Sequence, residues 1–237
     1  MKSIIVILLS TISLSLIAQE KSKDHKNDYM PIMTRGIGAS FQKFDGLNNR
    51  LAGFPQYETL KNHMWTLSLG SMHVRKNFIS QLTVTGGSSL SGDRDKKSSA
   101  LRFLSGGLDF GYDVIPAEKV MLYPLIGIGA ETYHAIFYKD NSAVAFNDVL
   151  LFPDVQNSIR SVKFMNTFIT YRLGLGIALK SPKHSGTIGI QAGYTGSFKD
   201  KAWKSSENQT LNAAPVDDLS RFSVSLVFGG SGGMMMK

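Results

Sequence analysis

The sequence predicts an all-β fold, namely an eight-stranded antiparallel up-and-down transmembrane β-barrel. Two observations support this prediction. In eight segments an apolar residue recurs at every second position, and the links between these segments alternate between short and long. A period of two is typical of half-buried strands, whereas an amphipathic helix repeats every 3.6 residues. The 237 residues fit a single barrel domain, because all-β domains often exceed 200 residues.

The chain begins with a segment typical of a secretory signal peptide. Lys2 precedes an apolar stretch from Ile4 to Ile17, which is shorter than the roughly 20 residues of a membrane-spanning helix. We expect Sec-type export and cleavage near Ala18, with an uncleaved anchor as the alternative. The expected divisions are residues 1–19 for the signal peptide, 20–33 for an N-terminal polar segment, 34–229 for the barrel and 230–237 for a flexible Gly/Met-rich tail.

The apolar rows follow one another along the chain and define the expected strands. In order, they are Ile37/Ala39/Phe41, Trp65/Leu67/Leu69, Phe78/Leu82/Val84, Leu104/Leu108/Phe110/Tyr112/Val114, Val120/Leu122/Ile126/Ile128, Met165/Ile169/Tyr171/Leu173/Leu175/Ile177/Leu179, Ile188/Ile190/Ala192/Tyr194/Phe198 and Phe222/Val224/Leu226/Phe228. In a membrane barrel such a row faces lipid. The residues predicted to face lipid are Leu108, Phe110, Ile126, Ile128, Leu173, Leu175, Ile188, Ile190, Val224 and Leu226.

The links predict which ends of the strands face which compartment. Short links fall near residues 75–77, 115–119 and 181–185, and long links span about residues 45–62, 88–99, 139–161 and 199–219. Short periplasmic turns and long extracellular loops are typical of outer-membrane barrels. The loop over residues 139–161 is less polar than the others, which predicts a folded lid or a docking surface.

The opposite row of each strand is rich in glycine and poor in charge. A strand surface in water normally carries many Lys and Glu residues, whereas a narrow lumen favours small residues and a few paired charges. A lone charge in an enclosed lumen is costly, so the charges of this row are expected to form an ion-pair network. Its predicted members are Arg102, Asp109, Asp113, Glu131 and Arg172. The alternative is a soluble exported barrel with its apolar face turned inward.

Aromatic residues near the expected strand ends favour interfacial girdles, although ordinary core packing is the alternative. They are Trp65, Tyr112, Tyr123, Phe137, Tyr138, Phe198, Phe222 and Phe228.

Motifs for catalysis, metals and cofactors are lacking in the sequence. There is no cysteine, and the five histidines lack the spacing of metal ligands. We therefore expect no metal site, no cofactor and no catalytic residue. The alternative is a lipid-modifying enzyme in which His134, beside Glu131, activates a serine. Acidic residues interrupt the basic stretches despite the net charge of +8, so nucleic-acid binding is not expected.

Several stretches resemble one family of barrel proteins. They are Leu47 to Leu51 with Phe54 and Pro55, Tyr112 to Pro116, Leu122 to Pro124 with Gly127 to Gly129, and Ala214 and Pro215 followed by Leu219 to Val224. Their order and spacing are similar to small outer-membrane β-barrel proteins common in Bacteroidota, of the eight-stranded OmpX/OmpA-barrel type. The resemblance implies insertion by the outer-membrane barrel assembly machinery, which recognises a terminal aromatic residue. Phe222 and Phe228 are the assembly signal, although nine residues follow Phe228.

The leading functional hypothesis is a non-enzymatic protein of the cell outer membrane whose lumen is plugged by side chains. Eight strands leave an interior just filled by side chains. Its expected partners are outer-membrane lipid, the assembly machinery and a surface or envelope protein bound by the loops. A narrow channel or transport component is the first alternative, and a lipid-modifying barrel enzyme is the second.

Overall fold

A computed structural model of the chain describes residues 31–92, 96–115, 117, 119–180 and 186–231. The chain divides into two compact units, Met1–Met30 and Pro31–Lys237, and the description below concerns the second unit. The expected signal peptide, nearly all of the N-terminal polar segment and residues 232–237 lie outside the described residues. Within the described ranges, no helix is long and apolar enough to cross a membrane.

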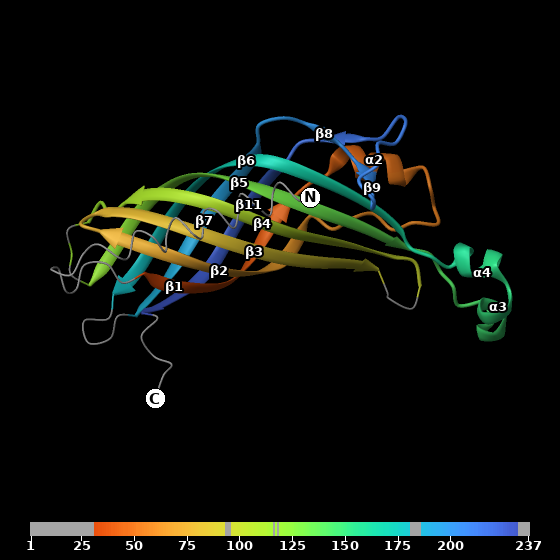
Figure 1. The fold of residues 1–237 in the computed structure, drawn as a ribbon, viewed down its shortest axis with the longest axis horizontal. Helices are drawn as coiled ribbons and strands as arrows, with labels where there is room; N and C mark the ends of the chain where they lie inside the picture. The colour runs from red at the N-terminus through yellow and green to blue at the C-terminus, as the bar shows by residue number, and fades with distance from the viewer. Residues whose placement is uncertain (1–30, 93–95, 116, 118, 181–185, 232–237) are drawn as a thin grey trace, which may run out of the picture. The chain divides into compact units, whose positions relative to one another are not determined.

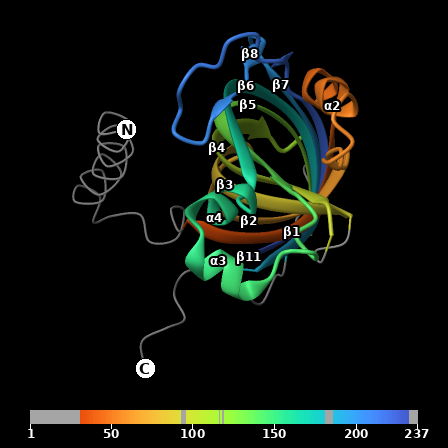
Figure 2. The same ribbon diagram turned by 90° about the vertical axis from the view of Figure 1, so that its right-hand side faces the viewer.

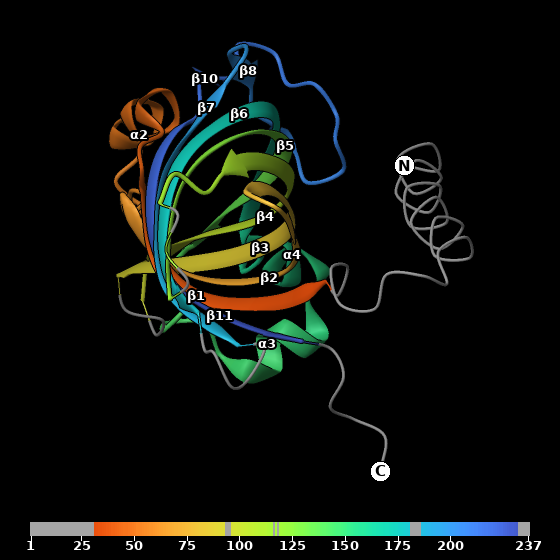
Figure 3. The same ribbon diagram turned by 90° about the vertical axis from the view of Figure 1, so that its left-hand side faces the viewer.

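Eight strands form a closed ring, which confirms the predicted eight-stranded antiparallel barrel (Figure 1, Figure 3). They are β1 (Ile32–Gln42), β2 (His63–Arg75), β3 (Phe78–Gly92), β4 (Ser98–Tyr112), β5 (Val120–Tyr138), β6 (Val162–Lys180), β7 (Thr187–Ser197) and β11 (Ser220–Ser231). Every pairing in the ring is antiparallel, and the β1–β11 and β5–β6 pairings complete it. The last strand runs two residues into the segment expected to be a flexible tail.

Links at the turn end of the ring span residues 76–77, 113–119 and 181–186. At the loop end, three links are long, as the sequence predicts, over residues 43–62, 139–161 and 198–219, but the β3–β4 link has only residues 93–97. The tightest turn is Lys76 and Asn77, where Lys76 has a φ of 56°. The long links carry short elements that the strand pattern did not predict. They are α2 (Asp45–Ala52), α3 (Phe146–Leu151), α4 (Pro153–Ser158), β8 (Lys201–Ala202), β9 (Lys204–Ser205) and β10 (Val216–Asp217).

Two of the long links differ from the sequence-based expectation in a way that has a clear physical origin. Helix α2 forms because Leu47 and Leu51, four residues apart, bury one face of it against the barrel. Strands β3 and β4 extend through most of the expected loop over residues 88–99, with Ser91 opposite Ser99. Backbone hydrogen bonds pair these polar residues, so the two strands continue beyond the point where the apolar alternation ends.

The outer wall of the ring is apolar. The ten residues predicted to face lipid all lie on this wall, with between 38% and 63% of each side chain exposed. Phe222 and Phe228 lie on the same wall. Each of the eight strands contributes at least one large exposed apolar residue, because successive side chains of a strand point to opposite faces.

The inner wall carries two separate apolar clusters, one at each end of the ring. The larger one lies at the loop end and packs strand residues against α2 and the β7–β11 link; it is called the loop-end core. Its buried members are Phe44, Leu47, Leu51, Leu60, Met64, Leu101, Phe103, Tyr133, Ala135, Phe137, Phe168, Trp203 and Leu219. The smaller one, called the turn-end cluster, consists of Met72, Ile79, Met121, Tyr123 and Ala178. Tyr123 and Phe137 are thus buried inside the barrel and are not girdle residues.

Helices α3 and α4 lie at the tip of the long β5–β6 link, beyond the loop end of the ring (Figure 1, Figure 2). Neither helix buries a side chain. The sequence left two possibilities for this link, a folded lid or a docking surface. The structure excludes a lid packed on the barrel, because the two helices form an exposed surface.

Candidate functional site in the barrel lumen

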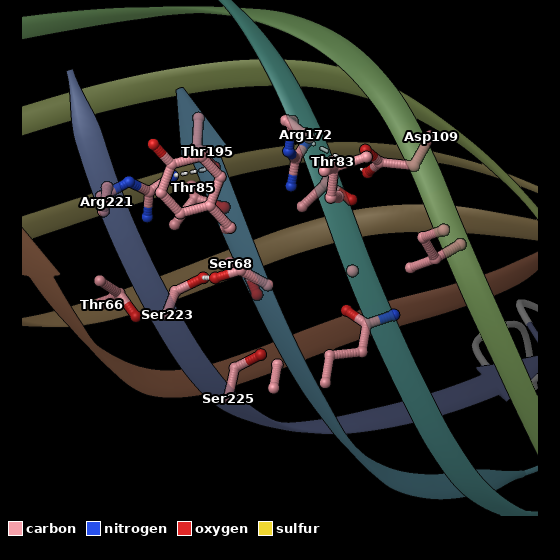
Figure 4. Close-up of a pocket in the computed structure, with 17 residues that line it drawn as sticks. Thr66, Ser68, Thr83, Thr85, Asp109, Arg172, Thr195, Arg221, Ser223 and Ser225 are labelled. Carbon is pink, nitrogen blue, oxygen red and sulfur yellow. Dashed lines mark hydrogen bonds and ion pairs between the residues drawn. The ribbon is translucent and has the colours of Figure 1, made fainter. Parts of the chain in front are cut away.

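A small polar cavity of about 80 Å³ lies between the two inner clusters (Figure 4). Hydroxyl groups from four strands line it, together with two arginines and one aspartate. The polar side chains at its wall are Thr66, Ser68, Thr83, Thr85, Asp109, Arg172, Gln191, Thr195, Arg221, Ser223 and Ser225. One water molecule needs at least about 10–15 Å³, so the cavity has room for a few waters but not for an extended solute.

Asp109 and Arg172 form an ion pair across the wall of this cavity. Arg172 Nη1 lies 3.1 Å from Asp109 Oδ2, and Asp109 is buried. The two residues come from β4 and β6, which flank β5, and Figure 4 shows their side chains pointing toward each other. A glycine makes this approach possible, since a Cβ atom at Gly107 would overlap the Arg172 guanidinium.

A second ion pair separates the cavity from the loop-end core. Arg221 on β11 donates a hydrogen bond to Glu131 on β5, and the Tyr133 hydroxyl donates to the same carboxylate at 2.9 Å. The Arg221 guanidinium also lies 4.9 Å from the centre of the Phe103 ring. Arg221 and Glu131 are both buried, and charges buried to this degree are tolerated only when paired.

Toward the turns, hydrogen bonds across the lumen close the cavity. Gln191 Nε2 on β7 donates to Gln81 Oε1 on β3 at 3.0 Å and to the Tyr123 hydroxyl on β5 at 3.1 Å. The turn-end cluster lies beyond them and contains the Tyr123 ring. The described part of the lumen is therefore closed by side chains on both sides of the cavity.

The five charges expected to form one network are divided differently in the structure. Asp109 pairs with Arg172, and Glu131 pairs with Arg221. Asp113 lies at the turn end, where it accepts a bond from Lys180 at 3.1 Å and a bond from the Leu122 amide. Three separate pairs thus replace the single network.

The prediction that Arg102 belongs to the lumen network is wrong, because Arg102 lies on the outer wall. Leu101 and Phe103 point inward on β4, so Arg102 between them points outward, as does Leu104. The error is one of strand parity, since residues 102 and 109 cannot share a face of a regular strand. His134 and Glu131 also point to opposite faces of β5, so they cannot form a catalytic pair with a serine.

Asp217 holds the loops together above the lumen. Its carboxylate accepts bonds from the Gly46 and Leu47 amides, at 2.7 and 3.0 Å, and from Trp203 Nε1 at 2.7 Å. Those two amides belong to the first turn of α2, where backbone donors lack partners within the helix. Burial raises the pKa of Asp217, and the hydrogen bond from Trp203 opposes that rise.

Sequence reasoning missed three residues that organise this region. Lys180 and Arg221 continue the inward rows of their strands, so strand parity could have found both. Asp217 lies in a loop far from α2 in the sequence, and no local signal could have paired them. Among the described residues, no group of three His, Cys, Asp or Glu side chains is placed to bind a metal ion.

The geometry defines the class as a closed eight-stranded barrel with an apolar outer wall and a lumen closed by side chains. No protein-family model matches the chain, and no curated protein sequence matches it. Among solved structures, Ail, the attachment invasion locus protein of Yersinia pestis, is 16% identical with a TM-score of 0.49, covering 86% of this chain and 98% of Ail. The N-terminal β-barrel domain of Pseudomonas aeruginosa OprF is 12% identical with a TM-score of 0.32, covering 82% and 96%. Acinetobacter baumannii CarO2 is 10% identical with a TM-score of 0.29, covering 85% and 100%.

Proposed function

We propose that the chain is a non-enzymatic outer-membrane β-barrel protein with a plugged lumen, whose loops bind a partner or support the integrity of the envelope. One observation carries this proposal, namely the exposed apolar rows on all eight strands of a closed ring. Soluble monomers rarely expose apolar patches larger than a few hundred Å². A closed barrel leaves no unpaired strand edge, which is the condition for strands to lie in lipid.

The two closures of the lumen support the plugged state. The Glu131–Arg221 pair and the loop-end core lie on one side of the cavity, and the Gln191 hydrogen bonds lie on the other. A narrow channel is the second candidate function, since the polar cavity between the closures is the kind of space through which a small solute could pass.

The distribution of turns and loops supports an orientation with the turns in the periplasm. Sec-type export and membership of the Bacteroidota-type family remain part of the proposal. So does insertion by the barrel assembly machinery through Phe228, whose side chain lies on the outer wall near the end of β11. Phe228→Ser should then reduce membrane insertion more than Phe222→Ser does, when both are quantified in outer-membrane fractions.

The tip formed by α3 and α4 is the proposed docking surface for an envelope or surface protein. Phe146, Leu150, Leu151 and Phe152 are each more than half exposed there. They are large apolar side chains, and helix α3 has no buried residue. Exposed apolar residues of a helix commonly anchor it in an apolar groove of a partner. Replacing Phe146 and Leu150 by serine should abolish copurification of a partner in mild detergent and leave the barrel folded.

The change in gel mobility on heating tests whether the protein forms a closed barrel. The protein from a membrane fraction should migrate differently before and after heating, because a closed barrel resists detergent until it is heated. A protein recovered from the periplasm with no such shift would contradict the proposal.

Planar-bilayer recording distinguishes the plugged barrel from the channel. We expect no stable unitary conductance, and such a conductance would favour the channel instead. Lipid A mass spectra from strains with and without the protein should be identical, since a difference would favour the lipid-modifying enzyme.

A further inference from the structure

A groove on the outer wall has one charged residue at its end. It crosses β1, β2 and β3, has a volume of about 860 Å³, and is lined on its outward side by Arg35, Ile37, Trp65, Leu67, Leu69, Val84, Gly86 and Ser88. Register places Arg35, Leu69 and Val84 in one row across the three strands, and Ile37, Leu67 and Gly86 in the next. The groove is thus a continuous recess between the side chains of neighbouring rows.

Gly86 makes the groove deep. A Cβ atom at this position would meet no atom closer than 3.7 Å, so a side chain would fit there without strain. Its absence leaves a gap between Leu67 on β2 and Leu104 on β4, the residues opposite Gly86. Ala39 and Ser88 on either side of Trp65 are also small, so the gap continues toward the loop end.

Arg35 is the charged residue, and its surroundings are apolar. Met33 and Ile37 flank it along β1, and Leu69 and Phe228 face it across the neighbouring strands. All four are 44% exposed or more. Within the described residues, the Arg35 side chain has no ion pair or hydrogen bond. An unpaired arginine in a lipid-facing wall costs up to about 2–4 kcal/mol at the bilayer midplane and about 0–1 kcal/mol near the interface.

The position of Arg35 is close to the turn-end interface. Below Leu69, the outward residues of β2 are Ser71, His73 and Arg75, so the apolar row of this strand ends there. On the neighbouring strand β3 the apolar row continues through Leu82 to Phe78 at the turn. Arg35 is the fourth residue of β1, about 10 Å from the start of the strand. Its guanidinium can therefore reach the depth of lipid phosphates, for which its planar array of donors is suited.

We propose that this groove binds one phospholipid of the turn-side leaflet, with its phosphate on Arg35 and an acyl chain along Gly86 toward Trp65. The distance between the Arg35 and Trp65 rows is four residues of β2, or about 13 Å, over which part of an acyl chain can lie. Trp65 is 74% exposed and bounds the groove at its far end. The inference rests on the proposed membrane location of the barrel.

Native mass spectrometry of the full-length mature barrel in detergent, titrated with palmitoyl-oleoyl phosphatidylglycerol, tests the site. The wild type should retain one phospholipid. Arg35→Gln should lower its apparent affinity about tenfold, because charge-assisted bonds to the phosphate are lost. Gly86→Leu should lower it to a similar extent by filling the groove, and Gly86→Ala should have a smaller effect.

Matched controls lie on the same wall outside the groove. A Cβ atom at Gly106 on β4 would meet nothing within 4 Å, so Gly106→Leu is an equally tolerated change that leaves the groove open. Lys163→Gln removes an outward charge near the loop end on β6, a strand that does not line the groove. Both should retain lipid like the wild type, and equal losses in the controls and the groove variants would overturn the proposal.

Further titrations identify which chemical group of the lipid the groove binds. Diacylglycerol with the same chains should bind weakly, and binding as tight as that of the phospholipid would overturn the role of Arg35. Excess inorganic phosphate should not displace the lipid, and full displacement would indicate a free-phosphate site instead. A dimer that Gly86→Leu abolishes while lipid retention is unchanged would indicate a second copy in the groove and overturn the proposal.

The gel shift on heating, measured for each variant, separates this inference from the proposed function. A wild type without the shift would overturn both. A wild type that shifts and inserts into vesicles but retains no phospholipid would overturn the groove alone.

Discussion

The two halves of the barrel interior differ although the same strands build both. On β5 the inward residues from Gly127 to Glu131 are small or charged, whereas Tyr133, Ala135 and Phe137 are large or apolar and fully buried. On β4 the inward residues change in the same way, from Asp109 and Gly107 to Phe103 and Leu101. The middle of the barrel is thus a polar lumen behind an apolar wall, and the turn-end cluster closes it toward the turns. The loop-side half is an ordinary protein core covered by loops.

With the proposed membrane location, this difference follows from the medium outside the wall. Behind the middle of the apolar wall, small residues and paired charges are sufficient to fill a narrow lumen. Beyond those rows the strands carry Arg102, His134 and Lys163 outward, and stability there must come from apolar burial inside.

The largest expected effect is a difference in the free energy of unfolding between replacing a phenylalanine inside the barrel and replacing one on its outer wall. Phe168 is fully buried against Phe44 and Tyr133, so Phe168→Ala should lower the free energy of unfolding by about 3–5 kcal/mol. Phe198 is 59% exposed on the outer wall, and Phe198→Ala should cost less than half as much, because lipid fills the space. Urea unfolding in lipid vesicles measures both, and equal losses would contradict the distinction between the two apolar environments.

A smaller effect is expected at the boundary between the two halves. Glu131→Gln removes the charge that balances buried Arg221, and should lower the free energy of unfolding by about 3 kcal/mol in the same assay. The exposed pair of Lys97 and Glu58, 3.9 Å apart, provides the control. Glu58→Gln should change stability by at most about 0.5–1 kcal/mol. A loss at Glu131 no larger than that at Glu58 would show that the boundary pair is solvated.

The smallest expected effect concerns the pH dependence of the loop-side half. Because burial raises the pKa of Asp217, the folded loops bind more protons than the unfolded ones at and above the usual value near 3.8. The stability of the loops should therefore fall slightly as pH rises through the raised pKa. Asp217→Asn keeps one oxygen acceptor, either for the Gly46 amide or for the Leu47 amide and Trp203, and should remove this dependence because the side chain no longer titrates.

The fluorescence of Trp203, which donates to Asp217, reports on the loops in this pH experiment. Because the chain has two tryptophans, the measurement uses a Trp65→Phe background. The wild type should show a pH-dependent change in unfolding of the loops that the Asn variant lacks. Parallel curves for the two proteins would assign the titration to another group.

Strand parity shows how far sequence reasoning extends. It correctly places the ten apolar residues of the outer wall, because alternation within one strand is a local property. The same rule, applied carefully, excludes Arg102 from the lumen and includes Lys180 and Arg221. Pairing is different: the partner of Asp113 is Lys180, 67 residues away, and the two meet because β4 and β6 both pair with β5.

The sequence by itself determined the barrel class, the number of its strands, the ends that carry turns and loops, and the apolar wall. Each of these follows from residue type and spacing along one strand. Only the tertiary structure decided which charges pair, where the lumen is closed, and how α2 is held by Asp217. It also decided that Gly86 and Arg35, on different strands, line one groove. These features depend on the register and closure of the ring, which bring distant segments together across its interior and its wall.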